Sequence, residues 1–304
     1  MKRDLISIKT LTLEQIKDIF DLTHKIKKSP KRFTGVLKGK TLALIFEKPS
    51  NRTYVSFQVG MYELGGNSVY LGPAQIKLGV RETIHDVAKT LSRYVDGIVL
   101  RTFAHQNVLD MAKYAGVPVI NGLSDLSHPC QALADTFTIK EKFGGFKNIT
   151  VAYIGDGNNV CNSLLYACAK LGVNINVATP QGYDPDADMV LGAKSAAEKT
   201  GSRISLFHKA QTAVQGANVI YTDVWASMGQ ESEAQKRKQD FKDYQVNKKL
   251  LSLADKNCLV MHCLPAHRGE EISDEVIDGD NSIIFDQAEN RLHVQKAILV
   301  KLLK

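Results

Sequence analysis

The sequence predicts an α/β protein of two domains, each a parallel sheet flanked by helices. Its 304 residues are enough for two domains of roughly 100–200 residues. Short, continuously apolar runs alternate along the chain with helical patterns, which is typical of parallel sheets covered on both faces. Hydrophobic residues make up 44% and charged residues 23%, as in ordinary globular proteins, which argues against a disordered or collagen-like chain.

The expected elements follow in chain order. Residues 12–28 predict an amphipathic helix, because Thr12 and Gln15 have the spacing of a capping box and apolar residues recur at helical intervals. The pattern of strands restarts near residue 150, after the polar, glycine-containing stretch 140–148, so a domain boundary is expected between residues 145 and 146. Nine strands are expected, at 41–46, 67–71, 97–100, 117–120, 150–154, 174–178, 218–222, 258–262 and 282–285.

Charge and composition exclude several classes of protein. The net charge of +7 favours an anionic partner, but the basic residues are scattered and form no aromatic-interleaved stripe, so no nucleic-acid partner is expected. No apolar run reaches the roughly 18 residues of a membrane-spanning helix, and residues 1–10 lack the apolar core of a signal peptide. The five cysteines form no CxxC pair, which argues against a disulfide framework or a structural zinc site. We therefore expect a cytoplasmic protein with no membrane partner.

Chemically useful residues gather just after predicted strands, where open parallel sheets bind their ligands. The first cluster, residues 50–53, follows strand 41–46 and begins a helical pattern. A helix N-terminus presents free N–H groups, Ser50 and Thr53 add hydroxyls, and Arg52 adds a planar fork for oxyanions. These residues suit a phosphate site, and the alternative is an ordinary N-cap beside a surface arginine.

Two further clusters follow the next strands of the first domain. Arg101 ends strand 97–100, where an arginine can meet an anion or a carbonyl oxygen, although a structural ion pair is the alternative. His128 precedes Pro129, a residue favoured at the first position of a helix, so His128 is expected at the N-cap. A neutral His N–H and the Gln131 amide could polarise a carbonyl, or His128 could be a hydrogen-bonded structural residue.

The second domain offers two ambiguous motifs. Cys263 follows strand 258–262 and is flanked by His262 and His267, so residues 262–269 could hold a thiol nucleophile or part of a metal site. The stretch 155–159, GDGNN, is similar to a dinucleotide-binding fingerprint, but position 160 is Val160 where the third glycine belongs. The residues alone do not decide between these possibilities.

The motifs SNRT (50–53), HPCQ (128–131), DVWASMG (223–229) and HCLPAHRG (262–269) occur in the order found in the aspartate/ornithine carbamoyltransferase family. The chain resembles that family, and its ornithine-type members most, over nearly its whole length. The resemblance implies a carbamoyl-phosphate-binding domain (1–145), an ornithine-binding domain (146–285) and a C-terminal helix (286–304) that packs back on the first domain. It also implies trimer-based assembly, no cofactor and no metal.

The resemblance further implies that the neutral δ-amine of L-ornithine attacks carbamoyl phosphate, giving L-citrulline and phosphate without a protein nucleophile. The residues it makes catalytic are Arg52, Thr53, Arg101, His128 and Cys263. It assigns to carbamoyl phosphate Ser50, Asn51, Arg52, Thr53, Lys77, Arg101, His128, Pro129, Cys130, Gln131, Cys263, Leu264 and Arg291. It assigns to ornithine Asn159, Asp223, Ser227 and Met228.

Three positions depart from the family pattern: Asn51 replaces a common Thr, Tyr54 a common Arg, and Lys77 a common Gln. Lys77 could still meet a phosphate, as a point charge. Other acceptors stay open as alternatives, namely putrescine, N-acylated ornithine and aspartate. Aspartate enzymes should lack the motif that begins at Asp223, and putrescine has no α-carboxylate to be recognised. Two other classes, a nicotinamide-dependent oxidoreductase and a non-catalytic relative, fit less well.

Overall fold

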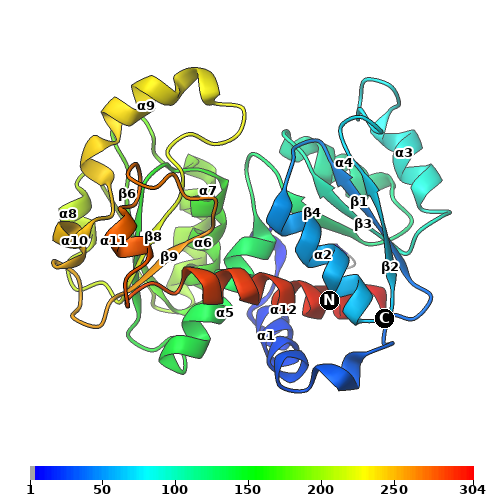
Figure 1. Ribbon diagram of the computed structural model, residues 1–304, viewed down its shortest axis with the longest axis horizontal. Helices are drawn as coiled ribbons and strands as arrows, with labels where there is room; N and C mark the ends of the chain where they lie inside the picture. Colours follow the sequence, from blue (N-terminus) through cyan, green and yellow to red (C-terminus); the bar gives the residue numbers. More distant parts are fainter. Residues whose placement is uncertain (1–3) are drawn as a thin grey trace. The chain divides into compact units, whose positions relative to one another are not determined.

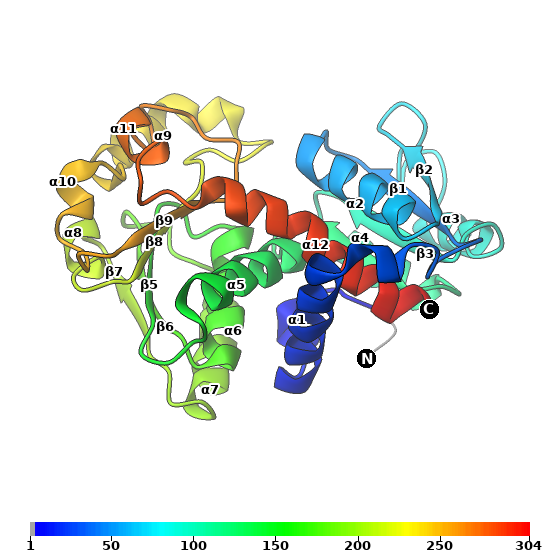
Figure 2. The ribbon, with the colours of Figure 1, turned by 60° about the horizontal axis from the view of Figure 1, so that its bottom comes forward.

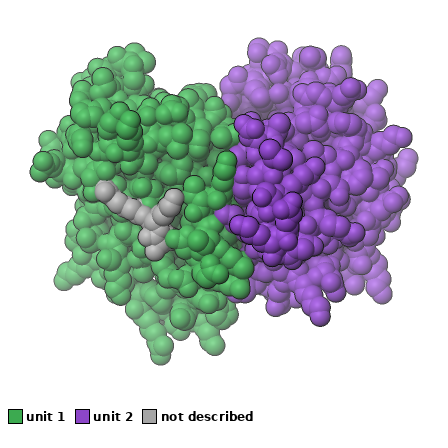
Figure 3. All heavy atoms as spheres, turned by 180° about the vertical axis from the view of Figure 1, so that it is seen from behind, with its two compact units in different colours: residues 1–137, 289–304 green, residues 138–288 purple. Residues whose placement is uncertain are grey.

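The computed structural model describes residues 4–304. Residues 1–3, which begin the stretch where no signal peptide is expected, lie outside that part. The chain divides into two compact units, residues 1–137 together with 289–304, and residues 138–288 (Figure 3). The last helix therefore returns the chain to the unit in which it began.

The sheet of the first unit has four parallel strands in the order β2-β1-β3-β4 (Figure 1). All four predicted strands of this unit are confirmed, although the fourth begins two residues later than expected. The strand β4 starts after Pro118, which has no N–H to donate to a ladder, and the Val119 N–H is bonded to Asp4 Oδ1 at 2.9 Å. The bounds are β1 Thr41–Phe46, β2 Asn67–Leu71, β3 Gly97–Arg101 and β4 Val119–Leu123.

Helices cover both faces of this sheet. Alternate strand residues such as Ala43 and Ile98 share a core with Val87 and Met111, so α3 and α4 lie on one face. The predicted first helix is confirmed, with the capping box formed between Thr12 and Gln15. The bounds are α1 Leu13–Lys28, α2 Asn51–Glu63, α3 Ile84–Leu91, α4 His105–Tyr114 and α5 Pro129–Phe143, with short 3-10 turns at Ile8–Thr10 and Pro30–Phe33.

The C-terminal helix α12, Ile284–Leu303, packs on the first unit, as expected (Figure 2). Lys296, on this helix, is buried and donates to Glu63 Oε2 at 2.6 Å. At Gly60, within α2, an added Cβ would lie 3.2 Å from the Lys296 side chain, so the glycine allows the two helices to approach closely. The predicted strand 282–285 is wrong, because α12 begins at Ile284. Ser282 makes only an isolated bridge to Val260, and the apolar run belongs to the first turn of the helix.

The sheet of the second unit has five parallel strands in the order β7-β6-β5-β8-β9. Four of them were predicted. The strand β7 was missed because it is a short edge strand whose residues are only partly buried, so its apolar signal is weak. The bounds are β5 Thr150–Ile154, β6 Asn174–Ala178, β7 Ile204–Phe207, β8 Val219–Thr222 and β9 Leu259–His262.

Helices also cover both faces of the second sheet. One face shares a core with α8, α10 and α11, and α6 and α7 pack against each other. Among residues 4–304, no helix is both long enough and apolar enough to cross a membrane. The bounds are α6 Asn159–Leu171, α7 Ala187–Glu198, α8 Ala210–Ala213, α9 Ala234–Asp240, α10 Lys248–Leu251 and α11 Asp274–Ile277, with 3-10 turns at Glu231–Glu233 and Lys242–Tyr244.

Candidate active site

The first cluster lies at the N-terminus of α2, directly beyond the end of β1. Ser50 is the N-cap, and its hydroxyl accepts the Thr53 N–H at 3.2 Å. Thr53 is buried, Arg52 is half-buried and Asn51 is exposed at the first helical position. The predicted helix start is therefore confirmed, and it places two hydroxyls and a guanidinium at a helix N-terminus, which attracts anions.

Arg291 of α12 joins this cluster to the HPCQ motif. Its Nη2 donates to Thr53 Oγ1 at 3.1 Å, and its Nη1 donates to Gln131 Oε1. The Gln131 amide nitrogen in turn donates to Asp135 Oδ1 at 2.7 Å. Because these groups are buried, each charge-assisted hydrogen bond holds its partner firmly in place. Three predicted residues, Thr53 on α2, Gln131 on α5 and Arg291 on α12, are thus brought together from distant parts of the sequence.

His128 lies among three arginines. Burial lowers its pKa well below the usual 6.5, and the positive charges of Arg291, Arg101 and Arg52 lower it further. The imidazole is therefore neutral at physiological pH, so it can donate one N–H without adding charge. The backbone carbonyl of His128 accepts the Ala132 N–H at 3.2 Å, as expected for an N-cap residue. Arg101 is 6% exposed at the end of β3. This part of the unit concentrates positive charge for an anion.

Cys130 is part of the same motif, but its side chain points elsewhere. The thiol donates to the Asn121 carbonyl at 3.7 Å, and burial raises its pKa to about 12. The thiol therefore stays protonated, and any contact of Cys130 with a ligand would come from its backbone. Pro129 begins α5 and has no N–H to offer.

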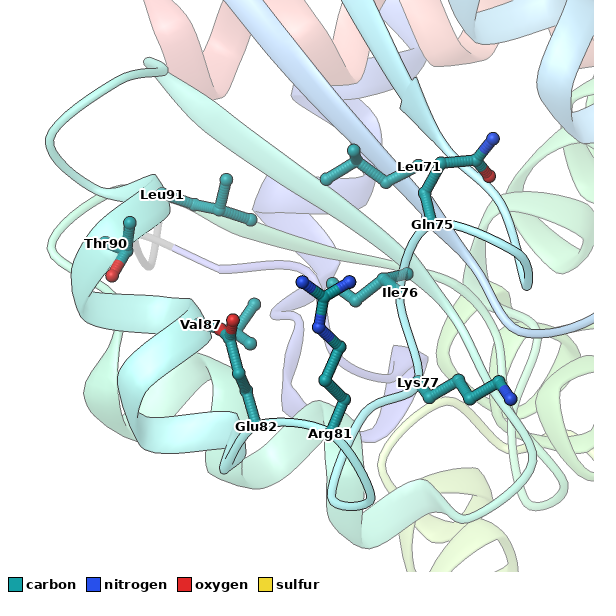
Figure 4. A pocket seen from close by; sticks show the side chains of 9 residues that line it. All are labelled: Leu71, Gln75, Ile76, Lys77, Arg81, Glu82, Val87, Thr90 and Leu91. Atoms are coloured by element: carbon teal, nitrogen blue, oxygen red, sulfur yellow. The ribbon is translucent and has the colours of Figure 1, made fainter.

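Lys77 lies in the loop between β2 and α3, which forms a pocket of about 220 Å³. The Arg81 side chain extends toward Ile76, whereas the Lys77 side chain extends in another direction (Figure 4). The lining of this pocket includes Lys77 and none of the residues 50–53. The structure thus leaves Lys77 apart from the other predicted donor-site residues of the first unit.

The second unit builds its cluster around Asp223, which follows β8. The Asp223 carboxylate accepts from Asn158 Nδ2 at 2.8 Å, from Cys263 Sγ at 2.9 Å and from the Val224 N–H at 2.8 Å. Cys263 is thus a protonated thiol that donates to a carboxylate, an arrangement that does not activate it as a nucleophile. Asp223 is only 6% exposed, so a cationic ligand would find a largely desolvated negative partner there.

Asn158 was not predicted, and its neighbour Asn159 was. Asn158 caps α6, because its Oδ1 accepts the Val160 and Cys161 N–H groups at 3.0 and 3.2 Å, while its Nδ2 reaches Asp223. Asn159 is the first residue of that helix and is half-buried. An Asn two residues before an apolar helical pattern is an N-cap signal that could have identified Asn158.

Ser227 and Met228 lie in a turn beyond β8. The Ser227 N–H donates to Gln230 Oε1 at 2.9 Å, and Met228 is 41% exposed. Arg237 braces this segment, donating to the Trp225 carbonyl at 2.8 Å and lying 3.2 Å from Asp156 Oδ2. Burial raises the pKa of Asp156 to about 6 against the effect of Arg237. Arg237 stands between Lys236 and Lys238, and such a basic run does not indicate that its middle residue is buried.

The loop after β9 is held by a buried pair that sequence reasoning left unassigned. His262 Nε2 lies 3.0 Å from Glu271 Oε1, and His262 Nδ1 accepts the Leu264 N–H at 2.8 Å. Because Nδ1 accepts, Nε2 carries the proton and donates to Glu271. Asp223, His262 and Cys263 bring ligand atoms within 4.8 Å of one another, but both His262 nitrogens are engaged in these hydrogen bonds. The motif thus fixes the backbone around Leu264, which has a φ of 59°.

The GDGNN stretch also has a structural explanation. A Cβ on Gly157 would lie 2.2 Å from the Pro185 nitrogen, so the segment Asp184–Pro185 requires a glycine there. The Gly157 N–H donates to the Tyr183 carbonyl at 2.9 Å across the same contact. The glycine therefore serves the approach of two loops, and it needs no dinucleotide to explain it.

The fold and these two clusters define a class: a two-unit α/β protein with an arginine-rich cluster in one unit and a carboxylate-centred cluster in the other. Two family models match the chain. "Aspartate/ornithine carbamoyltransferase, carbamoyl-P binding domain" matches residues 3–141, and "Aspartate/ornithine carbamoyltransferase, Asp/Orn binding domain" matches residues 147–302. The chain belongs to the aspartate/ornithine carbamoyltransferase family.

Similar proteins match this chain over nearly its full length. An ornithine carbamoyltransferase of Pyrococcus horikoshii is 54% identical, with 99% of this chain and 96% of that protein covered. The solved structure of an ornithine carbamoyltransferase from Pyrococcus furiosus has a TM-score of 0.96 at 52% identity, covering 99% of this chain and 96% of that one. The corresponding structure from Thermus thermophilus has a TM-score of 0.90 at 44% identity and covers both chains completely.

Proposed function

We propose that this protein transfers the carbamoyl group of carbamoyl phosphate to the δ-amine of L-ornithine, giving L-citrulline and phosphate. The observation that carries the proposal is the gathering of Arg52, Arg101 and Arg291 around the buried, neutral His128. A small dianion needs concentrated positive charge and many donors, and this part of the first unit supplies both. Full-length relatives named ornithine carbamoyltransferase support the same reaction.

In the proposed reaction, the helix N-terminus at Ser50–Thr53 holds the phosphate, and Arg101 and His128 donate to the carbonyl oxygen of the donor. Attack by an amine turns that carbonyl oxygen into an oxyanion, which fixed donors in a buried site stabilise strongly. Phosphate then leaves, and one of its oxygens takes the proton lost by the amine. Neither Cys130 nor Cys263 has to form a covalent bond, because the donor is already activated by its phosphate.

The second unit would bind the acceptor through Asn159, Asp223, Ser227 and Met228. The Asp223 carboxylate suits the α-ammonium, and the Met228 N–H and the Asn159 amide suit the α-carboxylate. Free ornithine carries a protonated δ-amine at neutral pH, with a pKa of about 10.4 like that of lysine. Cys263, which already donates to Asp223, is the candidate for positioning the neutral amine.

The acceptor is the point that separates ornithine from its alternatives. Putrescine has no α-carboxylate for the Asn159 amide and the Met228 N–H to bind. An N-acylated ornithine has no α-ammonium, so Asp223 would lack a cationic partner. A buried, hydrogen-bonded carboxylate therefore favours the free amino acid. A similar protein from Pyrococcus furiosus is named as anabolic, which supports a role in arginine biosynthesis. The proposal includes trimer-based assembly, a cytoplasmic location, and Lys77, Pro129, Cys130, Leu264 and Arg291 as donor contacts.

The test is a citrulline assay with carbamoyl phosphate and four acceptors: ornithine, putrescine, aspartate and N-acetylornithine. The parent protein should form product with ornithine alone, and Arg101→Ala should reduce that rate by at least about a hundredfold. Lys236→Ala, which changes a basic residue outside the proposed site, serves as the control and should retain the parent rate. Comparable rates with putrescine or N-acetylornithine would overturn the assignment of the acceptor.

A further inference from the structure

Two neighbouring strands deliver the donor-site residues of the first unit. The strand β1 leads into residues 50–53, and β3 ends at Arg101, whose register partner on β1 is Phe46. The ladder continues for one more bond past the end of β1, because the Glu47 N–H donates to the Arg101 carbonyl at 2.8 Å. Beyond that bond, side-chain contacts join the segments that follow the two strands.

A compact polar network spans this separation. Thr102 Oγ1 donates to Glu47 Oε2, and Asn107 Nδ2 donates to Thr102 Oγ1 at 2.9 Å and lies 3.4 Å from Glu47 Oε2. Thr102 is completely buried, and Glu47 and Asn107 are half-buried. The network thus converges two donors on one carboxylate, and the proposed reaction uses none of its three residues.

A second contact lies beside the first. The Lys48 ammonium sits over the Phe103 ring, 4.1 Å from its centre, and Lys48 is only 7% exposed. Glu47 therefore contacts Thr102, and Lys48 contacts Phe103. We call Glu47, Lys48, Thr102, Phe103 and Asn107 the strand-exit clasp. It acts directly between the segment that begins α2 and the segment that carries Arg101.

We propose that Thr102 and Asn107 are positioning residues that fix the entry to α2 relative to Arg101 by holding the Glu47 carboxylate. The inference rests on the proposed function, because one small dianion must meet both Ser50–Thr53 and the Arg101 guanidinium. A displacement of about 1 Å between catalytic groups can reduce a rate about a hundredfold. Only Lys48 and Pro49 lie between Glu47 and Ser50, so a shift of the carboxylate is passed on to the helix start.

The chain supplies a matched control at the opposite end of the same two strands. Asp96 precedes β3, and its carboxylate accepts the Thr41 N–H of β1 at 2.9 Å and the Lys40 ammonium at 3.0 Å. This carboxylate also joins β1 to β3, but it lies at their amino-terminal ends, away from the donor-site residues. A variant there weakens the same strand pair without touching the proposed clasp.

The experiment compares Thr102→Val, Thr102→Ser, Asn107→Ala and Asp96→Asn with the parent, using citrulline formation. Thr102→Val, which keeps the shape but removes the hydroxyl, should lower kcat/KM for carbamoyl phosphate by about ten- to a hundredfold. Asn107→Ala, at a half-buried position, should lower it in the same direction. Thr102→Ser should restore the parent value. Asp96→Asn should lower the melting temperature while leaving both KM values within about twofold of the parent.

The KM for ornithine, measured at saturating carbamoyl phosphate, should stay within about twofold of the parent in the two clasp variants. The inference is overturned if Thr102→Val and Asn107→Ala keep the parent kcat/KM for carbamoyl phosphate, or if Asp96→Asn lowers it equally. Thermal protection by inorganic phosphate gives a readout that needs no acceptor, and it should be weaker in Thr102→Val than in the parent. A different outcome is a parent protein that forms no citrulline and is still protected by phosphate, with that protection lost in Thr102→Val. This outcome would refute the proposed reaction but would support the positioning role of Thr102.

Discussion

The burial of His128 among arginines lets us predict how the free energy of unfolding depends on pH. Its folded pKa lies well below 6.5, because burial and the charges of Arg291, Arg101 and Arg52 all oppose protonation. Below pH 6.5 the unfolded chain therefore binds one proton more than the folded chain at this residue. The stabilising contribution of His128 is present above the unfolded pKa and is lost as the pH falls toward the folded pKa. Each pH unit in this window costs about 1.4 kcal/mol of unfolding free energy.

The perturbation is His128→Gln, which keeps a hydrogen-bonding side chain and removes the titrating group. Between about pH 7.5 and about pH 5.5, the parent should lose about 1.4 kcal/mol more unfolding free energy than the variant. Denaturant unfolding followed by circular dichroism at both pH values measures the difference, and other titrating groups cancel in the comparison. The exposed His24→Gln variant is the control and should follow the parent. Equal losses in parent and His128→Gln, within about 0.3 kcal/mol, would refute the reasoning.

Three further predictions concern kinetic constants and stability. Asp223→Asn should raise the KM for ornithine about ten- to a hundredfold, because it removes one charged hydrogen bond. The KM for carbamoyl phosphate, measured from initial rates, should stay unchanged. Tyr54→Ala should lower the melting temperature and raise the KM for carbamoyl phosphate, whereas Tyr54→Phe should match the parent; equal effects would rule out ring packing as the cause. Lys77→Gln should change kcat/KM for carbamoyl phosphate by less than about threefold if it makes one exposed contact, and a large loss would mean that its charge compensates for the missing arginine at position 54.

Most of the fold could be predicted because its signals are local. The capping box at Thr12 and Gln15, the N-cap at Ser50 and Pro129 at a helix start are each set by a few neighbouring residues. Buried parallel strands are also visible, because their apolar runs are continuous. The prediction of a strand at 282–285 is wrong for the same reason. An apolar, β-branched stretch at the start of a helix has the composition of a strand, and only its packing distinguishes the two.

The candidate site could be predicted only as separate pieces. The predicted strands place Arg101 and Asp223 at strand ends and His128 at a helix start, and parallel-sheet geometry explains why strand ends hold ligands. The bonds of Arg291 to Thr53 and Gln131 were beyond sequence reasoning from the residues, since they depend on how a helix at the end of the chain packs. Asn158 and Arg237 were missed for a related reason, because their function is to hold backbone segments that come together only in the fold.

Tyr54 illustrates how the fold accommodates a departure from the family pattern. Its ring lies 4.6 Å from Tyr70 and 6.4 Å from Phe46, centre to centre, and Phe46 lies 5.7 Å from Tyr70. These three residues come from the first turn of α2 and from the ends of β1 and β2, so the aromatic cluster braces the helix at the point where Ser50 caps it. Each such ring pair contributes about 0.5–1.5 kcal/mol beyond its burial. An arginine at this position would add charge, whereas the tyrosine adds rigidity, and three other arginines already surround His128. We therefore expect the proposed anion site to depend less on the number of cations at the helix N-terminus than on the fixed position of that helix.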